Sequence, residues 1–262
     1  MKKASLFFVV AMIVTLAGSQ LRASAEAPGM SPDEAISLLK DGNERYVGGT
    51  TKHPNQDQER RSLTASKGQN PFATVLGCSD SRVPIEELFD GGIGDIFVVR
   101  VAGNVVDTDE AGSIEYGVDH LGTPVLVILG HTKCGAVTAV AQNAEVHGNI
   151  PALVDNILPA VAKVKAKDPQ LAGDALVNEA VNANVWQGIE DLFKVSHAVR
   201  ERAKDGKVKV IGAVYDLESG KINWMGPHPE QDQLIAKYAV GDAGHGEAKP
   251  EAKPEAKPEG KK

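Results

Sequence analysis

Short apolar runs alternate with segments of helical periodicity through most of the chain. Three of these runs have the nearly continuous hydrophobicity of strands that are buried on both faces of a parallel sheet. They cover residues 72–76, 95–101 and 124–129. Helices are predicted between and beyond them, over residues 85–89, 111–121, 134–146, 150–165 and 175–204. This alternation predicts an α/β fold.

Further elements are predicted on both sides of this central pattern. Ser31 is placed to cap a helix, Pro32 takes its first position and Glu34 completes a capping box, and a polar stretch then runs to Asn70. Near the other end, residues 207–215 and 221–225 flank a turn and predict a hairpin. We therefore expect a mainly parallel β-sheet with an antiparallel edge strand, flanked by helices.

The two ends of the chain depart from this pattern. Residues 1–25 combine two lysines, an apolar run and a small-residue motif, which predicts a signal peptide cleaved after Ala25. An uncleaved N-terminal anchor is the alternative, although the apolar run of about 13 residues falls short of the roughly 20 that span a bilayer. Residues 247–262 repeat Glu, Ala, Lys and Pro and predict a disordered tail. Residues 26–246 then form one domain of ordinary α/β size.

Charge and the signal peptide narrow the partners and the location. The chain has 28 basic and 35 acidic residues, a formal net charge of −7, and removal of the three basic residues in 1–25 takes this to −10. An acidic surface argues against nucleic acid as a partner. Cleavage of the signal peptide implies a periplasmic protein with no membrane association.

The two cysteines, Cys78 and Cys134, carry the candidate chemistry. In an exported protein two cysteines commonly form a disulfide, which is one interpretation of the pair. However, Cys78 follows the first predicted strand, and His131 and Cys134 follow the third. Ligands bind beyond the carboxyl ends of parallel strands, and His131 and Cys134 share a face if a helix begins there. Two thiolates and an imidazole are ligands that zinc prefers, and three protein ligands leave a fourth position for water.

The surrounding residues carry a family resemblance. The sequence reads CSDSR at 78–82 and HTKCG at 131–135, with Arg100, Gly103 and Asn104 between the two motifs. This pattern resembles the signature of β-class carbonic anhydrases, over about residues 32–226. The resemblance implies one Zn2+ per chain, a parallel sheet flanked by helices, and a homodimer or tetramer. It assigns the metal ligands to Cys78, His131 and Cys134 and the catalytic pair to Asp80 and Arg82.

The same resemblance implies a substrate site for CO2 and bicarbonate. Its residues are Gln69, Val83, Phe97 and Tyr116, and in the family the wall is shared across a dimer interface. His120 lies four residues after Tyr116 and is a candidate for proton transfer, with a core histidine as the alternative. Val75 stands where members that are closed by bicarbonate carry Trp, so we expect the open form, in which Asp80 does not ligate the metal.

The implied activity is reversible hydration of CO2 to bicarbonate and a proton by a zinc-bound hydroxide. Asp80 would accept a hydrogen bond from that hydroxide, and Arg82 would hold Asp80 in place. Hydrolysis of carbonyl sulfide or carbon disulfide at the same zinc is the alternative among enzymes. The alternative that is not an enzyme is a periplasmic protein that is stabilised by a disulfide or that holds zinc structurally.

Overall fold

The computed structural model describes residues 29–239. The predicted signal peptide at 1–25 and the predicted tail at 247–262 lie outside the described residues. Within the described range, no helix combines the length and apolar character that crossing a membrane requires.

A five-stranded sheet lies at the centre, with the strand order β2-β1-β3-β4-β5. Four strands run parallel, and β5 runs antiparallel to β4 at the edge. Their bounds are β1 Ala73–Gly77, β2 Ile96–Arg100, β3 Val125–His131, β4 Lys209–Tyr215 and β5 Ile222–Gly226. Every residue of β1 and β3 is buried, which is why their sequences are apolar without alternation. The predicted strands and the predicted fold class are confirmed.

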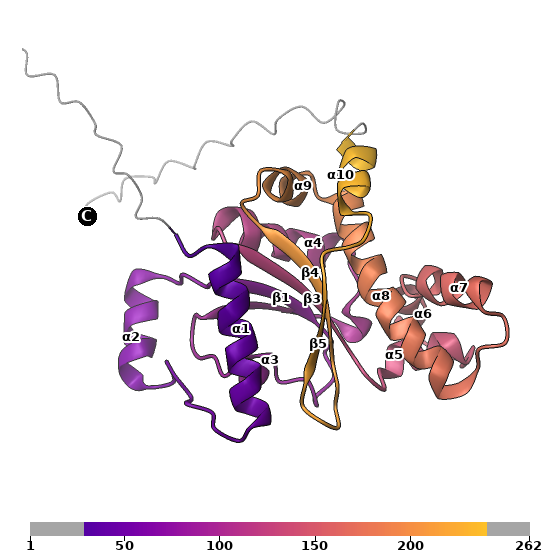
Figure 1. Cartoon of the computed structure of the whole chain (residues 1–262), viewed down its shortest axis with the longest axis horizontal. Helices are drawn as coiled ribbons and strands as arrows, with labels where there is room; N and C mark the ends of the chain where they lie inside the picture. Colours follow the sequence, from indigo (N-terminus) through magenta and orange to yellow (C-terminus); the bar gives the residue numbers. More distant parts are fainter. Residues whose placement is uncertain (1–28, 240–262) are drawn as a thin grey trace, which may run out of the picture.

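Helices cover both faces of the sheet (Figure 1). Because neighbouring strand residues point to opposite faces, Val127 and Ile128 of β3 belong to two different hydrophobic cores. One core lies under α1 and α3, and the other is built largely around the long helix α8. The helices are α1 Pro32–Val47, α2 Gln58–Lys67, α3 Ile85–Leu88, α4 Thr108–Glu115, α5 Gly135–Ala141, α6 Ile150–Val154, α7 Leu158–Lys167, α8 Gly173–Val195, α9 His197–Lys204 and α10 Gln231–Ala239.

The capping box of α1 is confirmed: the Glu34 backbone N–H donates to the Ser31 hydroxyl at 3.3 Å, and the Ser31 backbone N–H donates to the Glu34 carboxylate at 2.8 Å. The single helix predicted over 175–204 is wrong. It divides into α8 and α9 at Ser196, whose hydroxyl accepts from the Val199 backbone N–H and caps α9. The prediction over 150–165 likewise divides into α6 and α7.

Two helices were not predicted. The helix α2 buries none of its residues, so it has no apolar stripe that periodicity could detect. The helix α10 is short and buries only Leu234 and Ile235. Near the end of the predicted helix 111–121, the last turn widens into a π-helical turn, Tyr116–His120. This turn lies close to β1, because a Cβ at Gly117 would come within 2.4 Å of the Thr74 hydroxyl.

Candidate metal centre

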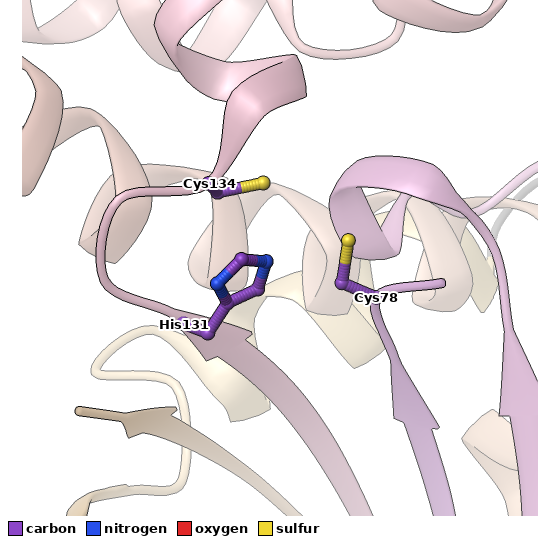
Figure 2. Close-up of side chains that lie close together, drawn as sticks. All are labelled: Cys78, His131 and Cys134. Carbon is purple, nitrogen blue, oxygen red and sulfur yellow. The ribbon is translucent and has the colours of Figure 1, made fainter. Parts of the chain in front are cut away.

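Two neighbouring parallel strands bring three metal-ligating side chains together. Cys78 directly follows β1, His131 is the last residue of β3, and Cys134 caps α5. Their ligand atoms all lie within 4.8 Å of one another, and all three residues are buried. Both cysteines are free thiols, so the structure does not contain the disulfide that was the alternative interpretation. Figure 2 shows the two thiols and the imidazole converging from separate segments.

The segment that joins His131 to Cys134 is not the start of a helix, as was expected. The helix α5 begins only at Gly135, and Cys134 has an extended backbone, with φ −68° and ψ 120°. Lys133 takes the left-handed conformation, with φ +55°, which is uncommon for a residue other than glycine. A tight turn, and not a helix, therefore carries Cys134 back toward His131.

The imidazole of His131 is prepared to bind a cation. Its Nδ1 lies 2.9 Å from the carbonyl oxygen of Thr132, and because a carbonyl only accepts, Nδ1 carries the proton. The lone pair is then on Nε2, which is buried and has no hydrogen-bond partner among the described residues. A buried polar atom without a partner costs about 1–3 kcal/mol. A metal ion at the centre of the cluster would be bound by this nitrogen, so the three residues fit a metal site.

The surroundings of Cys78 favour a thiolate. The backbone N–H groups of Gly103 and Asp80 point at its Sγ, at 3.2 and 3.4 Å. The neighbouring Cys134 thiol lowers the pKa of Cys78 well below its usual value, and the Gly103 and Asp80 N–H groups lower it further, although burial opposes them. The pKa of Cys134 is raised in turn, because its proton is held against the Cys78 thiolate and because it is buried. A divalent metal binds thiolates, so its binding would release the remaining thiol proton.

Asp80 and Arg82 form a bidentate ion pair beside the cluster. The Arg82 Nε donates to Asp80 Oδ1 at 2.9 Å, and its Nη2 donates to Oδ2 at 2.7 Å. These hydrogen bonds hold the pKa of Asp80 well below its usual range, so the carboxylate is ionised. Asp80 Oδ2 lies 3.9 Å from His131 Nε2. One carboxylate oxygen therefore lies beside the unprotonated nitrogen of His131.

Arg100 fixes the loop that carries Cys78 and Asp80. Its Nε donates to the Cys78 carbonyl at 3.0 Å, and its Nη2 donates to the Asp80 carbonyl at 2.7 Å. The sequence analysis placed Arg100 in the family signature but did not predict this role. The signal that could have revealed it is the register of the sheet, which pairs Arg100 of β2 with Gly77 of β1, one residue before Cys78.

The expected substrate residues do not gather around the cluster within one chain. Phe97 pairs with Thr74 in the sheet, four residues before Cys78, which is about 13 Å along the strand. Gln69 is exposed and precedes β1, at the opposite end from Cys78. Only Val83 follows the ligand loop closely, and it is fully buried in the core under α1.

Three of the expected residues form a partly exposed aromatic group instead. The rings of Phe97 and Tyr116 have centroids 5.8 Å apart, and His120 stacks on Tyr116 at 4.6 Å. Tyr116 is 46% exposed, and His120 is exposed as well. His120 is therefore not the core histidine that was its alternative interpretation.

Comparison with known proteins identifies the family of this chain. The family model described as carbonic anhydrase matches residues 73–222. Carbonic anhydrase 2 of Mycobacterium tuberculosis is 40% identical over 199 residues, which cover 74% of this chain and 93% of that protein. The carbonic anhydrase of Mycolicibacterium smegmatis is 38% identical over 200 residues, covering 74% and 94%. The crystal structure of the β-carbonic anhydrase CafA of Aspergillus fumigatus superposes with a TM-score of 0.63 at 26% identity, covering 79% of this chain and 97% of CafA. The chain therefore belongs to the β class of the carbonic anhydrase family.

Proposed function

We propose that this enzyme uses zinc to hydrate CO2 reversibly to bicarbonate and a proton. The observation that carries the proposal is the buried Cys78–His131–Cys134 cluster, in which His131 Nε2 has no partner among the described residues. The ionised Asp80 beside it supports catalysis over a purely structural metal site, because a structural site has no use for a carboxylate held at its edge.

Cys78, His131 and Cys134 would hold the metal. When bound by three protein ligands, zinc lowers the pKa of a water molecule from 15.7 to about 7 and so supplies a nucleophile near neutral pH. The His131 hydrogen bond to the Thr132 carbonyl fixes the tautomer that ligation needs. The N–H groups of Gly103 and Asp80 keep Cys78 oriented as a thiolate.

Asp80 is placed to accept a hydrogen bond from the attacking water and to aim its lone pair at CO2. Arg82 occupies both carboxylate oxygens, and this fork resists rotation of Asp80 toward the metal position. This geometry supports the open form, as does Val75 at the position where the bicarbonate-closed members carry Trp.

We propose that the working unit is a homodimer, or a tetramer of two dimers. Gln69, Phe97 and Tyr116 lie away from the cluster of their own chain, so they can line the CO2 site only when a second copy presents them. His120 joins this wall and is our candidate for carrying the proton to solvent. A solved relative from Sordaria macrospora is described as tetrameric.

Mixed dimers test this arrangement. One parent carries Cys78→Ser, which removes a metal ligand, and the other carries Tyr116→Ala, which removes part of the wall. If metal and wall come from different chains, each heterodimer has one intact site, and mixing inactive parents restores about a quarter of wild-type activity. Activity that stays at the level of the parents would contradict the shared site.

For the location, we propose export to the periplasm on the signal peptide predicted at 1–25. The chain would then meet an oxidising compartment, where zinc bound to Cys78 and Cys134 protects both thiols. Sequencing of the mature N-terminus tests this proposal, with Glu26 expected as the first residue.

One preparation tests the function. Zinc near one per chain, two free thiols after unfolding with a chelator, and CO2 hydration that falls sharply in Asp80→Asn would support it. Asp174→Asn, an exposed carboxylate in the first turn of α8, is the matched control and should keep full activity. A native Cys78–Cys134 disulfide with no zinc would refute the proposal. Turnover of carbonyl sulfide without CO2 hydration would identify the sulfur analogue, and not CO2, as the substrate.

A further inference from the structure

A hydrogen-bonded network outside the three ligands holds the turn that follows His131. The Thr132 hydroxyl donates to Asp216 Oδ2 at 3.3 Å and accepts from the Leu217 backbone N–H at 3.0 Å. The Thr132 backbone N–H donates to the Tyr215 carbonyl at 2.9 Å. Thr132 is therefore tied through both its backbone and its side chain to the end of β4, which lies next to β3 in the sheet.

Asp216 is itself held rigidly by the turn between β4 and β5. Its Oδ1 accepts from the Ser219 backbone N–H at 2.8 Å and from the Ser219 hydroxyl at 2.6 Å. These bonds to Ser219 hold the pKa of Asp216 below its usual range. Its Oδ2 remains for Thr132, so the carboxylate bridges the β4–β5 turn and the ligand turn.

This bridge controls the atom that orients His131. The carbonyl oxygen that accepts from His131 Nδ1 belongs to Thr132, so the imidazole follows any rotation of the peptide between Thr132 and Lys133. Lys133 has a left-handed backbone, which costs about 1–3 kcal/mol and persists only where its surroundings impose it. Two contacts impose it here: the Thr132 side chain on one side, and Arg82 Nη2, which donates to the Lys133 carbonyl at 3.3 Å, on the other.

We propose that Thr132 and Asp216 are positioning residues for the metal centre. Their hydrogen bond fixes the peptide whose carbonyl sets the direction of His131 Nε2, and it thereby raises the affinity of the site for zinc. Ligand-orienting groups of this kind typically contribute 10–100-fold to metal affinity. The inference rests on the proposed zinc site and adds two residues that do not touch the metal.

The test is metal affinity in Thr132→Val, which keeps the shape of threonine and removes its hydroxyl. Zinc and cobalt dissociation constants are measured on the full chain by competition with a chromophoric chelator. We expect Thr132→Val to weaken both metals about 10–100-fold and to shift the visible bands of the cobalt protein. Thr132→Ser keeps the hydroxyl and should recover most of the affinity.

Asp216→Ala provides a second variant in case Thr132→Val does not fold. It should weaken metal binding to a similar degree. The double variant should bind the metals no more weakly than the single variants, because both substitutions remove the same hydrogen bond. Ser219→Ala is its matched control, since it loosens the β4–β5 turn without removing the bond between Asp216 and Thr132.

Thr74→Val controls for the loss of a buried hydroxyl in general. Thr74 lies in β1, and its hydroxyl pairs with that of Thr123 at 2.7 Å, remote from the ligands. It should lower the free energy of unfolding and leave the metal dissociation constants unchanged.

The outcomes separate the two claims. If the wild type binds zinc and both Thr132→Val and Asp216→Ala bind it within twofold of the wild type, the positioning role is refuted and the proposed function stands. If the wild type binds neither zinc nor cobalt, the metal site itself is refuted, and the positioning role with it.

Discussion

Asp90 provides a sharp test of how a buried charge joins α1 and the loop after it to the segment that follows α3. Its side chain is wholly buried, although it is ionised, and it lies in the segment that follows α3. Its carboxylate accepts from Arg45 Nε at 2.5 Å and from the backbone N–H groups of Lys52 and His53 at 2.9 Å. Asp90→Asn removes the charge and turns an amide toward donors that need an acceptor.

The expected loss in the free energy of unfolding follows from the cost of breaking a buried ion pair. Breaking a buried ion pair by removing one partner costs about 3–5 kcal/mol. Arg45 is 27% exposed and regains some water, so we expect a loss near the lower end, about 3 kcal/mol. The measurement is urea unfolding at pH 7, with protein and zinc concentrations held fixed for both proteins because binding and association shift apparent stability.

The pH dependence of the free energy of unfolding provides a second, independent test of the same prediction. Burial raises the pKa of Asp90, but the bonds from Arg45, Lys52 and His53 outweigh it, and the net pKa is lowered. A lowered pKa means that the stabilisation is complete above the unfolded value of about 3.9 and is lost as pH falls through the folded value. The difference in free energy of unfolding between wild type and Asp90→Asn should therefore stay constant from pH 7 to 5 and shrink progressively as pH falls below 4. A loss under 1 kcal/mol at pH 7, or a difference that does not shrink at all below pH 4, would refute the reasoning.

Three further predictions concern the metal loop. Arg82→Lys loses the bidentate fork on Asp80, so kcat/KM for CO2 hydration in a stopped-flow assay should fall about 10–100-fold while zinc content stays near one per chain; unchanged kinetics would contradict the role of the fork. Gly103→Ala places a Cβ 2.7 Å from Ile157 at a residue whose φ is +75°, so urea unfolding should show a loss of about 2–4 kcal/mol in the free energy of unfolding. Gly112→Ala, where the new Cβ meets open space, should be neutral or slightly stabilising. Equal stability of the two variants would count against close packing at Gly103. Removal of zinc with a chelator should lower Tm, and zinc should restore it, because a metal that binds only the folded state stabilises it; a Tm indifferent to zinc would speak against the site.

The central sheet and the ligand set could be predicted from the sequence because each depends on a local pattern. β1 and β3 are buried on both faces, so their apolar runs mark them directly. Cys78 and His131 then fall at the same edge of the sheet, because the carboxyl ends of parallel strands meet at one edge. The register adds that Gly77 pairs with Leu129, which sets the two ligand loops side by side.

The remaining features depend on contacts between distant segments, which no local pattern reveals. Ser196 ends a helix because its hydroxyl caps the next one, while its neighbours remain amphipathic. The bond between Thr132 and Asp216 joins residues 84 positions apart. The turn at Lys133 replaced the expected helix because the surrounding bonds impose a left-handed backbone that the residue would not choose alone.

The most direct test of the account is zinc K-edge X-ray absorption on the protein as purified. The account predicts about one zinc per chain in a four-coordinate shell, with two sulfur atoms at about 2.3 Å, one nitrogen at about 2.0–2.1 Å and one further light atom. Cys78→Ser should lower the sulfur count to one. A protein without zinc and with Cys78 bonded to Cys134, or a zinc shell without sulfur, would contradict the account.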